Sequence, residues 1–126
     1  MIYTENAKKA LKLCFEAHKE QTDKSGLPYV FHPFYLAEQM EDEDTTVTAL
    51  LHDVVEDTDY TLEDLAAMGF SRNVTEALAL LTHDETVPYM EYVKALRNNP
   101  IARRVKLADL RHNSDLHRLN EDLFDV

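Results

Sequence analysis

Glycine is scarce in this chain, which has only Gly26 and Gly69 among its 126 residues. A glycine-rich phosphate-binding loop needs several glycines close together, because the backbone must approach the phosphate closely. The sequence therefore excludes nucleotide binding through such a loop. A chain of this kind has to hold a phosphorylated ligand with charged side chains or with a metal ion.

The chain also has a single cysteine and no long apolar run. Cys14 has no second cysteine with which to form an internal disulfide, and its apolar neighbours predict a buried role without reactivity. A membrane-spanning helix needs a run of about 18 apolar residues, which is absent. The N-terminal residues lack the basic and then apolar pattern of a signal peptide. We therefore expect a cytoplasmic protein that does not bind membranes.

Basic residues are outnumbered, with 13 Lys and Arg against 24 Asp and Glu, and the formal net charge is −11. A chain this acidic is not expected to bind DNA or RNA through general electrostatics. It would also repel a phosphorylated small molecule at long range. An anionic substrate must therefore be attracted locally, by a metal ion or by clustered Lys and Arg side chains.

Helical periodicity runs through most of the chain, and no sustained β-strand alternation is found. The length predicts one domain spanning residues 1–126. We expect an all-α fold, a single compact bundle of about six to seven helices. The residues expected to cap helix N-termini are Thr4 or Asn6, Asp44, Thr61, Asn73 and Asn99.

Further expectations concern single helices and loops. The first helix is predicted to run to about Gln21, with His18 on its apolar face as a core residue. The helix after Pro88 is expected to bury Met90, Val93 and Leu96. The pair His83-Asp84 is expected to lie in a plain loop, and residues 114–126 to form a short helix or a frayed tail.

The stretch 49–57 combines an apolar face with a row of polar side chains. Read as one helix, it places His52 and Glu56 four residues apart, and Asp53 and Asp57 likewise, so each pair is stacked along one side. A solvent-facing stripe is the ordinary explanation of such a row. Three carboxylates with an imidazole also favour a metal ion with adjacent acid and base groups.

Two further candidate ligands are distant from this stretch in the sequence. His32 lies at the end of an aromatic loop flanked by Pro28 and Pro33, and Asp109 is a lone carboxylate in an apolar run. Together with His52 and Asp53 they supply two imidazoles and two carboxylates. This donor set suits Mn²⁺, Fe²⁺ or Zn²⁺ with positions left for water and substrate.

Three blocks of the sequence resemble the RelA/SpoT-type (p)ppGpp hydrolase domain, which belongs to the HD-domain phosphohydrolases. Residues 24–33, KSGLPYVFHP, resemble its K-S-G-x-P-Y-x-x-H-P element. Residues 49–58, ALLHDVVEDT, are similar to its A-L-L-H-D-V-V-E-D-T element. Residues 106–113, KLADLRHN, resemble K-L-A-D-x-x-H-N. The blocks come in family order and cover most of the chain, which favours a small, hydrolase-only member.

The resemblance implies an all-helical domain that binds one Mn²⁺ and removes the 3′-pyrophosphate from guanosine tetra- or pentaphosphate. Other divalent metals, such as Fe²⁺, Zn²⁺ or Ni²⁺, are alternative cofactors. The implied metal ligands are His32, His52, Asp53 and Asp109. The implied catalytic pair is Glu56 and Asp57, and the implied nucleotide-binding residues are Lys24, Ser25 and Asn113.

Physical chemistry agrees with these roles. Hydrolysis of a phosphate ester near neutral pH needs an activated water and neutralised charge, and a divalent metal supplies both. Glu56 is placed to move a proton of that water, while Asp57 can hold a second proton or orient the water. Lys24 is the best candidate to meet the phosphates. Weaker candidates, equally explained as a basic solvent face, are Arg103, Arg104, Lys106 and Arg111.

Some positions depart from the family pattern near the nucleotide base. Asp23 stands where the family often has an Arg that helps hold the base, and Leu110-Arg111 replaces R-L. Relatives also continue past position 126 with helices that help close the nucleotide site. Two alternative functions follow: a phosphohydrolase acting on another nucleotide or phosphomonoester, and a non-catalytic nucleotide-binding sensor.

Overall fold

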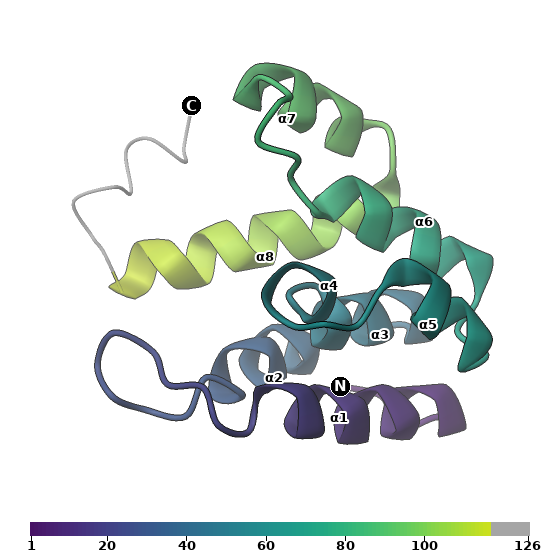
Figure 1. Ribbon diagram of the computed structural model, residues 1–126, viewed down its shortest axis with the longest axis vertical. Helices are drawn as coiled ribbons and strands as arrows, with labels where there is room; N and C mark the ends of the chain where they lie inside the picture. The colour runs from purple at the N-terminus through teal and green to yellow at the C-terminus, as the bar shows by residue number, and fades with distance from the viewer. Residues whose placement is uncertain (117–126) are drawn as a thin grey trace.

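The chain folds into helices joined by short loops, in a computed structural model that describes residues 1–116 (Figure 1). Within these residues the only β-type pairing is one isolated bridge, between Thr22 and Pro28. The predicted all-α fold is therefore confirmed. The helices are α1 Glu5–His18, α2 Phe31–Glu38, α3 Glu43–Leu51, α4 Val54–Asp57, α5 Leu62–Ala67, α6 Arg72–Leu81, α7 Tyr89–Arg97 and α8 Pro100–Leu116.

Helix α3 lies at the centre of the bundle. Every residue from Thr45 to Leu51 is buried, and α3 packs against α1, α2, α6 and α8. In Figure 1, α1 lies below α3, while α6 and α8 lie above it. A helix that is buried all round has neighbours on every side. Residues at its C-terminal end are therefore held firmly inside the bundle.

The helix predicted over residues 49–57 is interrupted. Helix α3 ends at Leu51, and α4 begins at Val54 after a turn in which Asp53 has φ −103° and ψ −1°. Figure 1 shows α4 nearly end-on, whereas α3 runs across the view. This break raises the helix count to eight within the described residues, against the six to seven expected. The Asp57 amide still donates to the Asp53 carbonyl at 2.9 Å, so Asp57 lies one helical turn after Asp53, as predicted.

Three predicted N-caps are confirmed, and two are wrong. Thr4, Thr61 and Asn99 each accept a hydrogen bond from a backbone amide in the first helical turn. The predicted Asp44 and Asn73 already lie inside their helices. The caps are instead Asp42 and Ser71, whose extended backbones (ψ 170° and 160°) turn the side-chain oxygen onto the first turn.

The inward face of α7 also differs from the prediction. Met90 is 64% exposed, whereas Tyr92 is 7% exposed and donates its hydroxyl hydrogen bond to the Leu81 carbonyl at 2.7 Å. Leu96 is buried as expected, and Val93 is half-buried. A phenol can be buried here because its polar end has a partner.

Other expectations at the ends of elements have mixed outcomes. Helix α1 ends at His18, three residues before the predicted Gln21, and His18 is fully buried as expected of a core residue. His83 and Asp84 lie in a loop, as predicted. Helix α8 continues through residues 114–116, and residues 117–126 lie outside the described part of the chain.

The expectation that Cys14 is buried is confirmed. Cys14 is fully buried, and burial followed by the charge of Asp53 raises the pKa of its thiol to about 12. Such a thiol is unreactive near neutral pH. Among residues 1–116, no helix has both the length and the apolar character to cross a membrane.

The corrected cap of α6 leads to a test. Ser71→Ala is expected to lower the free energy of unfolding by about 0.5–2 kcal/mol, because the Val74 amide loses its side-chain acceptor. Asn73→Ala is the matched control and is expected to leave stability unchanged or slightly raised, since Ala is the better helix former. Urea denaturation at unchanged m-value measures both. A larger loss for Asn73→Ala than for Ser71→Ala would restore Asn73 as the cap.

Candidate metal and nucleotide site

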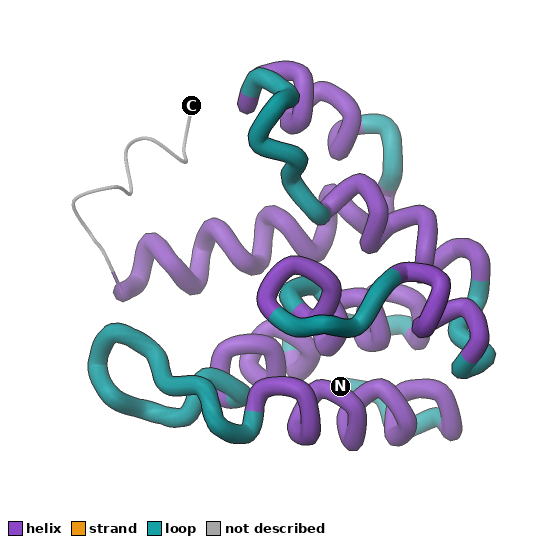
Figure 2. The backbone as a smooth tube through the Cα atoms, in the orientation of Figure 1, coloured by secondary structure: helices purple, strands orange, loops and turns teal. Residues whose placement is uncertain are grey.

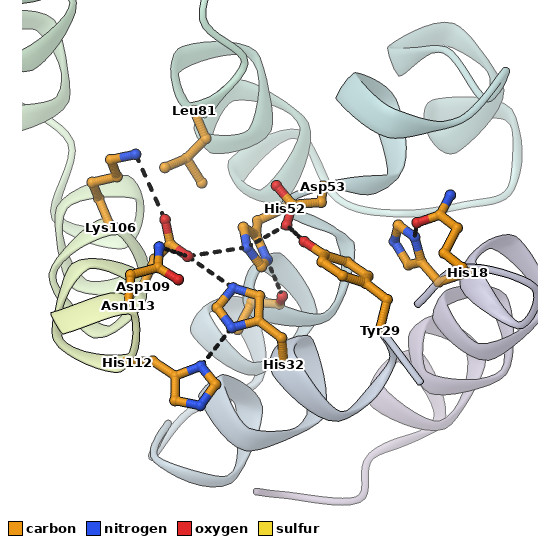
Figure 3. A network of polar contacts seen from close by, with 12 residues as sticks. His18, Tyr29, His32, His52, Asp53, Leu81, Lys106, Asp109, His112 and Asn113 are labelled. Carbon is orange, nitrogen blue, oxygen red and sulfur yellow. Dashed lines mark hydrogen bonds and ion pairs between the residues drawn. The ribbon is translucent and has the colours of Figure 1, made fainter. Parts of the chain in front are cut away.

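Three of the four predicted metal ligands meet inside the bundle (Figure 3). His32 lies on α2, His52 directly follows α3, and Asp109 lies on α8. One ligand atom from each residue lies within 4.8 Å of those of the other two. Asp109 Oδ1 is 2.8 Å from His32 Nε2 and 3.7 Å from His52 Nε2. Residues that are up to 77 positions apart in the sequence therefore form one cluster.

Asp53, the fourth predicted ligand, lies beside this cluster. Its Oδ2 is 3.0 Å from His52 Nε2, although Asp53 is not one of the three residues grouped above. The Tyr29 hydroxyl donates a hydrogen bond to the same oxygen. Sequence reasoning assigned no role to Tyr29, although it is the tyrosine of the first family-like block, between Pro28 and Pro33. Tyr29 holds one carboxylate oxygen of Asp53 toward the cluster.

The orientation of His52 tests whether a cation fits. His52 Nδ1 donates to the Ala49 carbonyl at 2.7 Å, so the neutral ring has its lone pair on Nε2. That atom is buried and has no hydrogen-bond partner among the described residues, although the oxygens of Asp53 and Asp109 are close. A buried lone pair facing two carboxylates is unfavourable unless the ring takes up a proton or a cation lies among these groups. The donor set therefore fits a divalent metal ion.

His112 supports the other imidazole ligand. Its Nδ1 lies 2.6 Å from His32 Nδ1, and its ring stacks between His32 and Tyr35, with centroids 4.8 and 4.4 Å away. A neutral His32 that keeps the Nε2 lone pair for a metal carries its proton on Nδ1 and donates it to His112. Partners of this kind orient metal-binding imidazoles. Sequence reasoning assigned no role to His112, although it belongs to the third family-like block.

Electrostatics at the cluster are dominated by the two carboxylates. Burial lowers the pKa of His52, but Asp53 and Asp109 outweigh burial and raise it to about 10. Burial raises the pKa of Asp53, yet His52 outweighs this effect and the pKa falls to about 2. Burial raises the pKa of Asp109, but the neighbouring imidazoles of His32 and His52 outweigh burial and lower it. The site thus stabilises positive charge, which a bound metal would supply in place of a proton.

Two cavities open on the cluster, and both are lined by Asp53 and Asp109. The larger has a volume of about 640 Å³, and the smaller of about 210 Å³. The larger cavity is lined by Thr22, Asp23, Lys24, Ser25, Tyr29, His32, Asp53, Asp57, Asp109 and Asn113. The smaller cavity is lined by His52, Asp53, Glu56, Leu81, His83, Tyr89, Tyr92, Val105, Lys106 and Asp109.

The predicted nucleotide-binding residues all line the larger cavity. Lys24 and Ser25 come from the loop between α1 and α2, and Asn113 comes from α8. Figure 2 shows this loop extending to the level of the C-terminal end of α8. Asp23, at the position where the family often has Arg, accepts hydrogen bonds from the backbone amides of Ser25 and Leu27 at 2.8 and 3.0 Å. Its carboxylate therefore shapes the loop.

The predicted catalytic pair is divided between the cavities. Glu56 lines the smaller cavity and Asp57 lines the larger, because successive residues of a helix point about 100° apart. Burial, then the charges of Asp53 and Asp57, raises the pKa of Glu56. Burial, then the charge of Asp53, raises the pKa of Asp57. Both carboxyl groups are thus better proton acceptors than ordinary surface carboxylates.

The basic residues of α8 do not form one uniform solvent face. Arg103 and Arg111 are exposed, and Arg104 donates to the Gln39 carbonyl at 3.1 Å. The Lys106 side chain is only 24% exposed, and its Nζ lies 3.6 Å from Asp109 Oδ2 (Figure 3). Lys106 therefore faces the cluster, and it lines the smaller cavity whereas Lys24 lines the larger.

Comparisons with known proteins show the family of the chain. No family model matches the chain. The guanosine-3′,5′-bis(diphosphate) 3′-pyrophosphohydrolase MESH1 of Xenopus tropicalis is 37% identical over 123 residues, which cover 86% of this chain and 68% of that protein. This chain belongs to the RelA/SpoT-type hydrolase family. Mouse MESH1 (Mus musculus) is another relative, 38% identical over 120 residues, which cover 82% of this chain and 66% of that protein.

A solved structure from the same family is similar to this chain. It is that of a metazoan orthologue of SpoT that hydrolyses ppGpp, and it matches with a TM-score of 0.68 and 28% sequence identity. The match covers 86% of this chain and 68% of the other. The chain thus spans about two thirds of the length of the MESH1 relatives that it matches.

Loss of one imidazole tests the metal site. His52→Ala is expected to weaken Mn²⁺ binding by more than about 10–100-fold, the loss typical when only a partner of a ligand is removed. His83→Ala, an imidazole outside the cluster, is the control. Metal content after dialysis and the metal-dependent rise in melting temperature measure the effect, since ligand at 100 Kd stabilises by about 2.7 kcal/mol. Equal metal binding by wild type and His52→Ala would contradict the site.

Proposed function

We propose that the protein is a divalent-metal-dependent phosphohydrolase that removes the 3′-pyrophosphate from guanosine tetra- or pentaphosphate. The observation that carries this proposal is the cluster of His32, His52 and Asp109. Two of its members, His32 and Asp109, line the larger cavity together with Lys24 and Asn113. The MESH1 relatives, which carry this activity in their names, support it. Mn²⁺ is the proposed metal, with Fe²⁺, Zn²⁺ or Ni²⁺ as alternatives.

In this proposal the metal is held by His32 Nε2, His52 Nε2, Asp109 and, as a fourth ligand, Asp53. A bound divalent ion supplies two things: it neutralises phosphate charge and lowers the pKa of a water. Tyr29 and His112 hold Asp53 and His32 in place through the contacts described above. Substrate binding and proton transfer are assigned to the residues that line the two cavities.

The nucleoside and its 5′-phosphates are assigned to the larger cavity. Its volume of about 640 Å³ is within the range of roughly 300–1,000 Å³ found for small-molecule sites. The Lys24 ammonium is placed to meet phosphate oxygens, while Ser25 and Asn113 offer uncharged polar groups to the sugar and phosphates. The 3′-diphosphate then points toward the cluster and the smaller cavity.

The division of Glu56 and Asp57 suits an in-line displacement. In phosphoryl transfer the attacking and leaving oxygens are roughly in line on opposite sides of the phosphorus. With the nucleoside in the larger cavity, the ribose 3′-oxygen leaves on the side of Asp57, and water attacks from the side of Glu56. The Glu56 carboxylate takes a proton from the water, and protonated Asp57 donates one to the 3′-oxygen.

This reaction is balanced in atoms and charge. One bond forms between the water oxygen and the phosphorus next to the ribose, and the bond between that phosphorus and the ribose 3′-oxygen breaks. The products are a guanosine 5′-phosphate ester with a free 3′-hydroxyl and inorganic pyrophosphate. A proton passes from Asp57 to the product, and Glu56 holds the proton of the attacking water until it is released.

We further propose that residues 1–126 form one HD-type domain that acts in the cytoplasm. The site takes its residues from the α1–α2 loop, from α2, from the α3–α4 turn and from α8, so it needs the described bundle as a whole. The buried free thiol of Cys14 is consistent with a reducing compartment.

A second candidate is hydrolysis of another nucleotide or of a phosphomonoester. Asp23 favours it, because this carboxylate is engaged with the backbone of its own loop, at a position where the family often has an Arg near the base. The base end of the larger cavity therefore lacks the cation that the family pattern would place at this position. The products distinguish the candidates: pyrophosphate from a 3′-diphosphate, or a single phosphate from another substrate.

The test is product release by Mn²⁺-loaded protein from a nucleotide panel that includes guanosine tetraphosphate. Glu56→Gln is expected to lower kcat by about 10²–10⁴-fold, the usual loss of a general base, while substrate binding is retained. Glu63→Gln, an exposed acid on α5, is the matched control and should keep full activity. Pyrophosphate release identifies the first function, and single phosphate the second. Binding without turnover in the wild type would favour a sensor and contradict both.

A further inference from the structure

The smaller cavity is too small for a nucleoside but has room for more than one water. Its volume of about 210 Å³ is below the roughly 300 Å³ at which small-molecule pockets begin, yet several times the ~30 Å³ share of one water. We propose that it is a binding site for the pyrophosphate product, with Lys106 as the cation that holds the phosphate oxygens. This inference rests on the proposed function, because it assigns the 3′-diphosphate to that side of the cluster.

Lys106 is held in place to serve this role. Its Nζ lies 3.6 Å from Asp109 Oδ2 and 5.6 Å from the centre of the Tyr92 ring, and the side chain is mostly buried. A lysine that only solubilised the surface would extend into water. An ammonium group has three hydrogen-bond donors, and contacts with one carboxylate and one ring face leave donor capacity for a phosphate.

The wall beyond Lys106 is built from fixed aromatic rings. The His83 ring lies 4.5 Å from that of Tyr92 between centroids, and the Tyr92 hydroxyl is bonded to the Leu81 carbonyl. His83 Nε2 in turn contacts the Val87 carbonyl at 2.9 Å, which ties the loop before α7 back on itself. Tyr89 is half exposed and also lines the cavity. The cavity is thus pre-formed on the side away from the nucleoside.

The acidic groups that line this cavity do not prevent phosphate binding in the proposed reaction. Asp53 and Asp109 are neutralised by the metal that they hold. Glu56 takes up the proton of the attacking water and is neutral when the product has formed. Lys106 then remains as the side-chain charge that faces the pyrophosphate, and nucleoside diphosphate stays near Lys24 in the larger cavity.

Product binding tests this assignment. Calorimetry would measure the affinity of Mn²⁺-loaded protein for inorganic pyrophosphate and for guanosine 5′-diphosphate. Lys106→Met and the near-isosteric Lys106→Gln are expected to weaken pyrophosphate binding about tenfold or more, because each removes a charge-assisted hydrogen bond. Both variants are expected to leave the binding of guanosine 5′-diphosphate unchanged. Lys24→Met should show the reverse pattern. Unchanged pyrophosphate affinity, or equal loss of both ligands at unchanged metal content, would overturn the inference.

A second measurement uses the wild-type protein, so it tests the proposal even if the Lys106 variants fail to fold or to bind metal. Lysine acetylation with limiting reagent, followed by mass spectrometry, reports which amine each ligand shields. Pyrophosphate is expected to protect Lys106, and guanosine 5′-diphosphate to protect Lys24. Protection of Lys24 alone by pyrophosphate would overturn the assignment.

The outcomes also separate this inference from the proposed function. If pyrophosphate binds through Lys106 but no pyrophosphate is released from guanosine tetraphosphate, the substrate assignment fails and the phosphate site stands. If pyrophosphate is released but binds without Lys106, the function stands and the smaller cavity has no such role.

Discussion

The buried carboxylate of Asp109 is the point on which the site depends. Its Oδ1 faces His32 and His52, while its Oδ2 faces Lys106, so one side chain joins α2, the end of α3 and its own helix. An anion in this position needs compensating positive charge, because an isolated buried carboxylate is costly. Imidazoles and an ammonium supply part of it, and the proposed divalent ion would complete it. The same contacts position the ligands and hold three helices together.

The fold was predictable where local rules decide it. Helical periodicity, Thr61 with Asp64 as a capping box, and Asn99 before Pro100 all identified elements correctly. The errors came where an equally good capping residue stood two positions away, as with Ser71 and Asn73. The break after Leu51 was not predictable from periodicity, because the polar spacing of residues 52–57 fits a continuous helix as well as it fits two.

The candidate site was predictable only in part. Motif resemblance predicted His32, His52 and Asp109 as ligands, and the structure brings these three together. Tyr29 and His112 also belong to the family-like blocks, but no role was predicted for them, and the structure shows that they contact Asp53 and His32. These two contacts join residues 24 and 80 positions apart, and no local pattern encodes such a pairing. Lys106 was likewise indistinguishable from Arg103 by spacing, and only burial against Tyr92 separates them.

The proposed binding of a highly anionic nucleotide by an acidic protein poses an electrostatic problem. The net charge of −11 repels such a ligand at a distance, so attraction has to be concentrated at the site. The arrangement places Lys24 in one cavity, Lys106 in the other, and the metal-binding cluster between them. A guanosine 3′,5′-bis(diphosphate) carries its charge in two separate groups, and under the proposed function each group would meet its own lysine. Repulsion elsewhere on the surface would then act against anions that lack this two-ended pattern, so the overall charge would contribute to selectivity.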